Sequence, residues 1–166
     1  MEDAVADVLR QWERAYPGLD TGPIAVIGRI NRCAALLQQS SSGLLGAEGL
    51  TRPEFDILGA LRRADHELTP TQLARESFAS GAAVTKRLRL LEKRGLIARR
   101  TDERDRRVTH LSLTASGREL VDRLIPVMIA NDRALLAGLT AEQNNELARA
   151  LGHLLLTLEG SIGRMP

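Results

Sequence analysis

Residues 68–117 read LTPTQLARESFASGAAVTKRLRLLEKRGLIARRTDERDRRVTHLSLTASG. The stretch predicts a short helix from Pro70, a tight turn at 76–81, and a second helix that ends at Gly95. After Gly95 the apolar spacing changes to that of two extended segments on either side of a charged tip. A short helix, a tight turn, a second helix and a hairpin, in this order, form a winged helix-turn-helix. The stretch therefore predicts the fold class, mainly α with a small β-hairpin wing.

The second helix of this stretch has two different faces. Val84, Leu88 and Leu91 recur at helical spacing and should face inward. Small residues at the N-terminal end of the other face would let the helix enter the ~12 Å major groove of DNA, where that end meets the base edges. We expect the DNA contacts of this helix to come from Ser80, Gly81, Ala82, Thr85, Lys86 and Arg89.

The hairpin tip, IARRTDERDRRV at residues 97–108, holds five arginines and three acids in twelve residues. Alone, such a run is either a solvated turn or a surface for a polyanion. Its place directly after the helix pair favours the second interpretation, with arginines along the DNA backbone or in the minor groove. We expect contacts from Arg104, Arg106 and Arg107. One wing arginine should be structural, although the sequence does not say which, and Asp105 could pair with Arg107.

Positive charge is concentrated around these two elements. Residues 86–107 contain ten basic and four acidic side chains, a net charge of +6, so the remainder carries −4 of the chain's total of +2. A basic segment on a near-neutral body indicates a local anionic partner rather than general stickiness.

The flanking sequence predicts helices. Thr51, Thr69 and Thr140 are each followed three residues later by Glu or Gln, a capping box, so helices should begin near 52, 70 and 141. Further helices are expected at about 3–15, from Pro23 onward, and from 114 to about 137. The serine-rich segment 40–49 should be a loop.

Composition limits the other function classes. The 166 residues suit one domain, and no apolar run approaches the ~20 residues that span a bilayer. The N-terminus lacks the charge pattern of a signal peptide, so a cytoplasmic protein is expected. The single cysteine, Cys33, excludes an internal disulfide and is most simply a small core residue. We find no metal-ligand spacing, no nucleotide-binding loop and no catalytic set, and expect no enzyme activity, cofactor or metal.

Residues 68–117 resemble the DNA-binding lobe of the MarR family of bacterial transcription regulators. The resemblance rests on Leu73-Ala74, Val84-Thr85, Leu91-Glu92, residues 94–97, Asp102 with residues 105–107, and Leu113-Thr114 with Gly117. It implies a homodimeric regulator, most simply a repressor, that binds pseudo-palindromic double-stranded DNA. It also implies a helical dimerisation region at residues 1–50 and 114–166 and a winged lobe at residues 51–113.

The N-terminal sequence is similar to the urate-responsive branch of that family, typified by PecS and HucR. That branch has an additional N-terminal helix bearing a tryptophan. The resemblance implies a site for a small anion, urate or a related purine or phenolic compound, at Trp12, Asp56, Arg87 and Arg99. Two guanidiniums could hold a planar anion, while the indole stacks and the carboxylate tethers an arginine. Arg87 lies on the second helix of the helix-turn-helix, so a change in its position would re-aim that helix.

Two alternatives remain open at the level of sequence. The basic helix and wing could meet an acidic protein rather than DNA, which would need no palindrome. Cys33 could act as a redox sensor, although the chain has no second cysteine to resolve an oxidised thiol.

Overall fold

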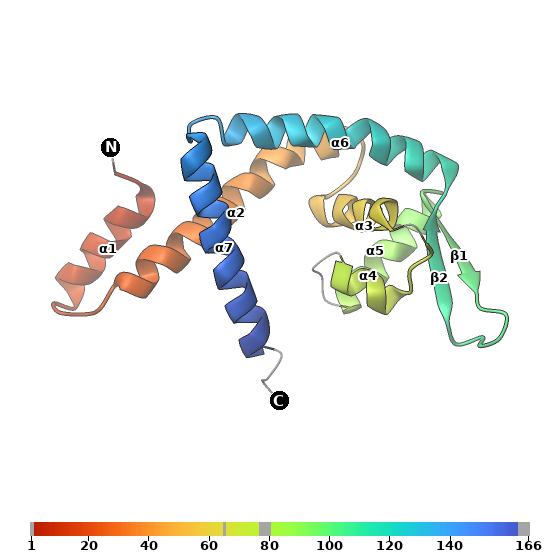
Figure 1. Ribbon diagram of the computed structural model, residues 1–166, viewed down its shortest axis with the longest axis horizontal. Helices are drawn as coiled ribbons and strands as arrows, with labels where there is room; N and C mark the ends of the chain where they lie inside the picture. Colours follow the sequence, from red (N-terminus) through yellow and green to blue (C-terminus); the bar gives the residue numbers. More distant parts are fainter. Residues whose placement is uncertain (1, 65, 77–80, 163–166) are drawn as a thin grey trace. The chain divides into compact units, whose positions relative to one another are not determined.

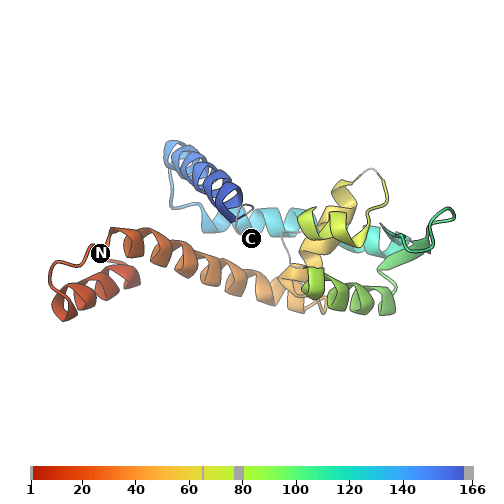
Figure 2. The ribbon, with the colours of Figure 1, turned by 90° about the horizontal axis from the view of Figure 1, so that it is seen from below.

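The computed structural model describes residues 2–64, 66–76 and 81–162, without the side chains of residues 81–83 and 162. The described chain divides into two compact units, residues 1–123 and 124–166. Its elements follow the expected order, with a two-stranded antiparallel sheet after the fifth helix (Figures 1 and 2). They are α1 (Ala4–Ala15), α2 (Gly22–Gly46), α3 (Arg52–Arg63), α4 (Pro70–Glu76), α5 (Gly81–Lys93), β1 (Ile97–Thr101), β2 (Thr109–Leu113), α6 (Ala115–Leu135) and α7 (Ala141–Ile162).

The three expected capping boxes start the helices at the expected residues. The Glu54 carboxylate accepts from the backbone N–H and the hydroxyl of Thr51, both at 2.8 Å. The Gln72 amide oxygen accepts from the N–H of Thr69 at 2.8 Å. The same pairing joins Thr140 and Gln143 in front of α7. Because each box satisfies backbone groups that the first turn leaves unpaired, it fixes where the helix begins.

The expectation of a loop at residues 40–49 is wrong for residues 40–46, because α2 continues to Gly46, and holds only for the turn at residues 47–49. The Ser40 hydroxyl donates to the carbonyl of Leu37, and those of Ser41 and Ser42 donate to the carbonyl of Gln38. Each hydroxyl thus bonds to a carbonyl three or four residues earlier in α2, so these serines are accommodated within the helix. Leu45, which is fully buried, anchors the last turn. The chain turns at residues 47–49, and Gly49 there has a φ of +64°.

α1 is fastened to the N-terminal half of α2. The Asp3 carboxylate caps α1 by accepting from the N–H groups of Val5 and Ala6, and it also pairs with Arg29 of α2 at 2.9 Å. Gly28 permits the close approach, since a Cβ there would lie 3.0 Å from a methyl carbon of Val5. α1 and α3 therefore adjoin opposite ends of α2, which is 25 residues long (Figure 1).

The winged lobe has an aliphatic core. α3 packs against α2, α4, α5 and β2, and α5 also packs against β1. Leu68 adds one short pairing to the hairpin, because its N–H and carbonyl bond the backbone of Leu111 at 3.1 and 2.8 Å. Side chains that are at most 1% exposed fill the centre; in the lobe they are Ile57, Leu58, Leu73, Val84, Leu88, Leu91 and Leu111.

The C-terminal unit contains the last part of α6 and the whole of α7. Along α7 the leucines Leu147, Leu151, Leu155 and Leu158 are each between 43 and 50% exposed. No helix within the described residues combines the length and apolar character needed to cross a membrane.

Cys33 lies exposed on α2, so its expected place in the core is wrong. All residues from 31 to 39 are exposed, so none of the described residues covers this part of α2. The apolar residues around Cys33 on α2 predicted that its side chain would be buried. No described part of the chain packs against this stretch of the helix.

Candidate nucleic-acid interface

The two faces expected for α5 are confirmed where the structure describes them. Val84 and Leu88 are each 1% exposed and Leu91 is fully buried, so one face anchors the helix in the lobe. Thr85, Lys86 and Arg89 lie exposed on the rest of its surface.

The remaining positions expected on this helix fall at its N-terminal end. α5 begins at Gly81, and the side chain of Ala82 is not described. Ser80 lies outside the described residues.

The wing is an antiparallel hairpin whose register runs from Ile97 opposite Leu113 to Thr101 opposite Thr109. Ile97 and Leu111 are buried and fasten it to the lobe, while the outer residues of β1 are exposed. The tip between the strands is therefore held away from the core, where it is accessible to a partner.

Asp102 organises the tip. One of its carboxylate oxygens accepts from the N–H groups of Arg104 and Asp105, at 2.8 and 2.9 Å. The other carboxylate oxygen lies 2.9 Å from Nε2 of His110 on β2. The backbone N–H of Asp105, the His110 ring and the backbone N–H of Arg104 together lower the pKa of Asp102 to about 2. A carboxylate with these partners stays ionised at neutral pH and keeps the tip in one shape.

The wing arginines divide into paired and unpaired groups. Arg99 pairs with Glu92 of α5 at 2.7 Å, and Arg100 holds Glu67 through two guanidinium nitrogens at 2.5 and 3.2 Å. The guanidinium of Arg100 lowers the pKa of Glu67, as expected for a close opposite charge. Both pairs link β1 to other parts of the lobe, Arg99 to α5 and Arg100 to the segment before α4.

The other three arginines, Arg104, Arg106 and Arg107, are exposed at the tip. Among the described residues their guanidiniums have no hydrogen-bond or ion-pair partner. Asp105 does not pair with the Arg107 side chain; it accepts from the backbone N–H of Arg107 at 3.0 Å. Three cations therefore remain available to a partner.

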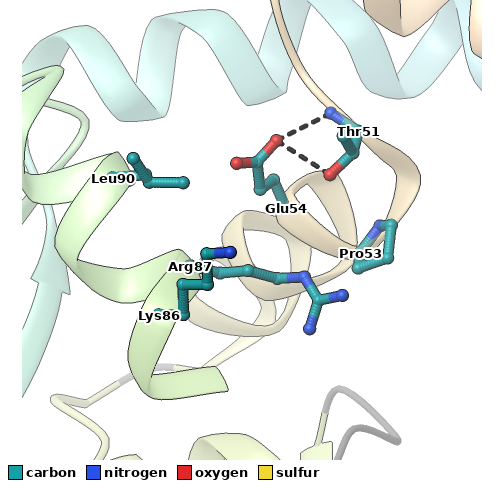
Figure 3. Close-up of a pocket in the computed structure, with 6 residues that line it drawn as sticks. All are labelled: Thr51, Pro53, Glu54, Lys86, Arg87 and Leu90. Atoms are coloured by element: carbon teal, nitrogen blue, oxygen red, sulfur yellow. Dashed lines mark hydrogen bonds between the residues drawn. The ribbon is translucent and has the colours of Figure 1, made fainter. Parts of the chain in front are cut away.

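An open cavity of about 490 Å³ lies between α5 and the first turn of α3. Arg87 and Lys86 extend toward it from α5, opposite Pro53 and the capping box formed by Thr51 and Glu54 (Figure 3). Arg87 is half-buried, and no carboxylate within the described chain forms an ion pair with its guanidinium. The cavity thus holds two cationic side chains, Lys86 and Arg87, and one carboxylate, that of Glu54, which already accepts from Thr51.

Asp56 lines a neighbouring cavity of about 410 Å³, which shares Thr51 and Pro53 with the first. Its carboxylate pairs with Arg52 at 2.9 Å, one turn earlier on α3. Arg87 and Asp56 are therefore brought to adjacent cavities at the start of α3.

Trp12 and Arg99 line neither of these two cavities. Trp12 is 41% exposed on α1, where its ring lies 6.0 Å from that of Tyr16. A single described chain therefore does not assemble the four residues of the expected ligand site.

Several site residues were not evident from the sequence. Glu67, which holds Arg100, lies 33 positions before it, and no local pattern marks such a pair. The link between Asp102 and His110 could have been suspected from their places across an expected hairpin. Lys86 was expected only at DNA, yet it also lines the Arg87 cavity.

One face of α5 is buried in the lobe, and Thr85, Lys86 and Arg89 are exposed on the rest of the helix. A hairpin with three exposed arginines follows it. Together these features define a winged helix-turn-helix DNA-binding protein. Comparison with known proteins agrees. The model of the MarR family matches residues 48–108. The HTH-type transcriptional regulator PecS of Dickeya dadantii (strain 3937) is 32% identical over 152 residues, which cover 90% of this chain and 92% of that protein.

Other relatives agree with this match. The HTH-type transcriptional repressor Rv2887 of Mycobacterium tuberculosis (strain H37Rv) is 36% identical over 135 residues, covering 81% of this chain and 95% of that one. AbsC, a MarR family regulator from Streptomyces coelicolor, has a TM-score of 0.76 at 26% identity, covering 86% of this chain and 97% of AbsC. MepR of Staphylococcus aureus, in a complex with DNA, has a TM-score of 0.75 at 25% identity, covering 80% and 97%. The chain belongs to the MarR family and is a transcriptional regulator.

Proposed function

We propose that the protein is a homodimeric repressor that binds a pseudo-palindromic DNA site and is released from it by a small anion such as urate. The observation that carries the proposal is a set of exposed cationic side chains on one lobe. Lys86 and Arg89 lie on α5, and Arg104, Arg106 and Arg107 lie at the wing tip. Acting on DNA, such a regulator would work in the bacterial cytoplasm, bound to the nucleoid.

Exposed apolar surface supports the dimer. The four leucines of α7 recur at spacings of four, four and three residues, and each leaves more than two fifths of its surface in solvent. Ile27 and Leu37 of α2 are similarly exposed. A monomer rarely leaves such aliphatic stripes uncovered, and helices with apolar stripes associate through them. We therefore assign residues 1–50 and 114–166 to the dimer and residues 51–113 to DNA binding.

Two kinds of DNA contact are proposed for the basic surface. The residues that would contact the major groove are those expected from the sequence, Ser80, Gly81, Ala82, Thr85, Lys86 and Arg89. Arg104, Arg106 and Arg107 would contact phosphates or the minor groove from the wing. Contacts to base edges specify sequence, whereas contacts to phosphates contribute affinity for any sequence.

Selection from a random duplex library tests this function. The wild-type protein should recover a pseudo-palindrome whose half-site centres lie about 10 bp apart. Lys86→Ala should recover a changed base preference within the half-sites. Recovery of sequences without a shared palindrome would refute the function, and an unchanged preference would remove Lys86 from base reading.

The effector would bind beside Arg87. The Arg87 guanidinium and the cavity at the start of α3 support an anion there, and Asp56 in the adjacent cavity could accept from a ring N–H. Because Arg87 belongs to α5, an anion that draws it toward α3 would tilt the DNA-reading helix. Arg99 would join this site only by leaving Glu92, and Trp12 only from the partner protomer, since α1 and α3 adjoin opposite ends of α2.

Urate titration of the protein–DNA complex tests the effector. We expect urate to release DNA from the wild type, and Arg87→Ala or Trp12→Phe to blunt the release while leaving DNA binding without urate mostly intact. Arg63→Ala, at the other end of α3, is the matched control and should respond as the wild type does. Absence of urate binding at millimolar concentration would remove urate as the effector.

A further inference from the structure

The end of the DNA-reading helix is tied to the end of α2. Arg94, directly after α5, donates through its two terminal nitrogens to the carbonyls of Glu48 and Gly49, both at 2.7 Å. These carbonyls belong to the turn that follows α2, where Gly49 has a left-handed backbone. A Cβ at Gly49 would lie 3.7 Å from the Arg94 guanidinium, so the arginine packs over the turn as well as bonding to it.

The same turn is also tied to α6. The Glu48 side chain pairs with Arg123 at 2.8 Å. The two ties therefore converge on Glu48, whose carbonyl bonds Arg94 and whose carboxylate bonds Arg123.

The residues next to Arg94 are held from another side. The carbonyl of Gly95 accepts from the hydroxyls of Thr114 and Ser116, at 2.6 and 3.0 Å. The carbonyl of Leu96 accepts from the N–H of Thr114 at 3.2 Å and lies directly against Gly117. Residues 94–96 are thus a joint, which we define as the point where α5, β1, the turn after α2 and the start of α6 meet.

We propose that Arg94 is a positioning residue for DNA recognition, because the hydrogen bonds of its guanidinium to the carbonyls of Glu48 and Gly49 set the angle between the DNA-reading helix and α2. The inference rests on the proposed dimer, in which α2 of each protomer belongs to the shared interface. The angle at each joint then determines how far apart the two α5 helices lie. Arg94 contacts no base in this scheme; it determines which half-site spacing the dimer accepts.

The geometry distinguishes this role from a general contribution to stability. A loss of stability weakens binding to every DNA equally. A loosened joint instead weakens binding to the correctly spaced site and makes the dimer more tolerant of a wrongly spaced one. One inserted base pair moves the half-sites about 3.4 Å apart and rotates them by about 36°.

The first test uses DNA as the probe. The palindrome selected by the wild-type protein is compared with the same duplex carrying one base pair inserted at its centre. We expect the insertion to weaken wild-type binding at least about tenfold and Arg94→Gln binding at most about threefold. Arg100→Gln is the matched control, because the hydrogen bonds of the Arg100 guanidinium to Glu67 lie within the winged lobe and do not involve α2. That variant should keep the wild-type ratio, even if removal of a cation lowers affinity for both duplexes.

The second test needs no DNA. With Cys33 changed to Ser and Arg89 to Cys, one spin label on each α5 reports the distance between the two reading helices of a dimer. Arg94→Gln should broaden this distance distribution, and Arg100→Gln should leave it unchanged.

The outcomes separate the two proposals. An unchanged distribution or an unchanged spacing ratio in Arg94→Gln would overturn the role of Arg94 while leaving the dimeric regulator in place. Absence of any distance between labels in the wild-type background would refute the dimer, and with it this role.

Discussion

Gly117→Ala should be among the most destabilising single changes in this chain. Gly117 is buried in the first turn of α6, where its N–H donates to the Thr114 hydroxyl at 3.0 Å. A Cβ built on it would overlap the carbonyl oxygen of Leu96 and would lie 2.9 Å from the carbonyl carbon and 3.2 Å from the Cα. The obstacle is backbone, which cannot rotate away as a side chain could, so α6 must shift away from the joint.

The expected cost is about 3 kcal/mol, the upper end of the range for overpacking, because the shift also strains the hydrogen bonds from Thr114 to Gly95 and Leu96. For a chain of this length that corresponds to a fall in Tm of about 6–12 °C. Thermal unfolding at equal protein concentrations measures it, since the stability of a dimer depends on concentration.

Gly59→Ala in α3 is the matched control, because it lies in the winged lobe and outside the proposed dimer region. The nearest described atom to a Cβ at Gly59 is a guanidinium nitrogen of Arg63 at 3.4 Å, which can move aside, so the change should stabilise the helix by about 0.5–1 kcal/mol. A Gly117→Ala protein whose Tm equals that of the wild type would refute the close approach of α6 to Leu96.

Three further changes test other parts of the account. Changing Arg106 and Arg107 together to Ala should weaken binding to all duplexes and reduce the slope of log K against log salt by about 1.8, and an unchanged slope would show that neither contacts phosphate. The lowered pKa of Asp102 means that its ionised form stabilises the wing above pH 3.8, and this contribution is lost as the pH falls toward about 2. Protection of the hairpin amides, measured relative to the intrinsic exchange rate at each pH, should therefore fall over that window in the wild type, but should show no such fall in Asp102→Asn; parallel profiles would contradict the tip geometry. Leu111→Ala, at a fully buried position, should cost about 2–5 kcal/mol in urea unfolding, and a cost below about 1 kcal/mol would argue against its place in the core.

Local signals allowed much of the fold to be predicted. A Thr with Glu or Gln three residues later is a capping box, whose bonds are all local in sequence. The starts of α3, α4 and α7 could therefore be predicted from the sequence. Gly95 ends α5 with φ at +69°, as its place after two basic residues indicated. The spacing of the apolar residues was sufficient to predict the two faces of α5 and the extended segments of the hairpin.

Three features could not be predicted from local sequence: the helical state of residues 40–42, the exposure of Cys33 and the distant partners of Arg94. The serines at 40–42 looked like a loop because composition does not reveal that each hydroxyl bonds back to its own helix. Cys33 looked buried because its neighbours are apolar, although the described chain leaves them uncovered. The partners of Arg94 lie 45 and 46 positions away, and only the folded chain brings them together.

Hydroxyl-radical footprinting of the protein on its selected duplex, combined with the mass of the complex, tests the central claim most directly. Two protomers should occupy one palindrome and protect two backbone regions about one helical turn apart, with added protection where the arginine tips of the wings lie. A complex with one protomer, or a single continuous protected region without two-fold symmetry, would contradict the account.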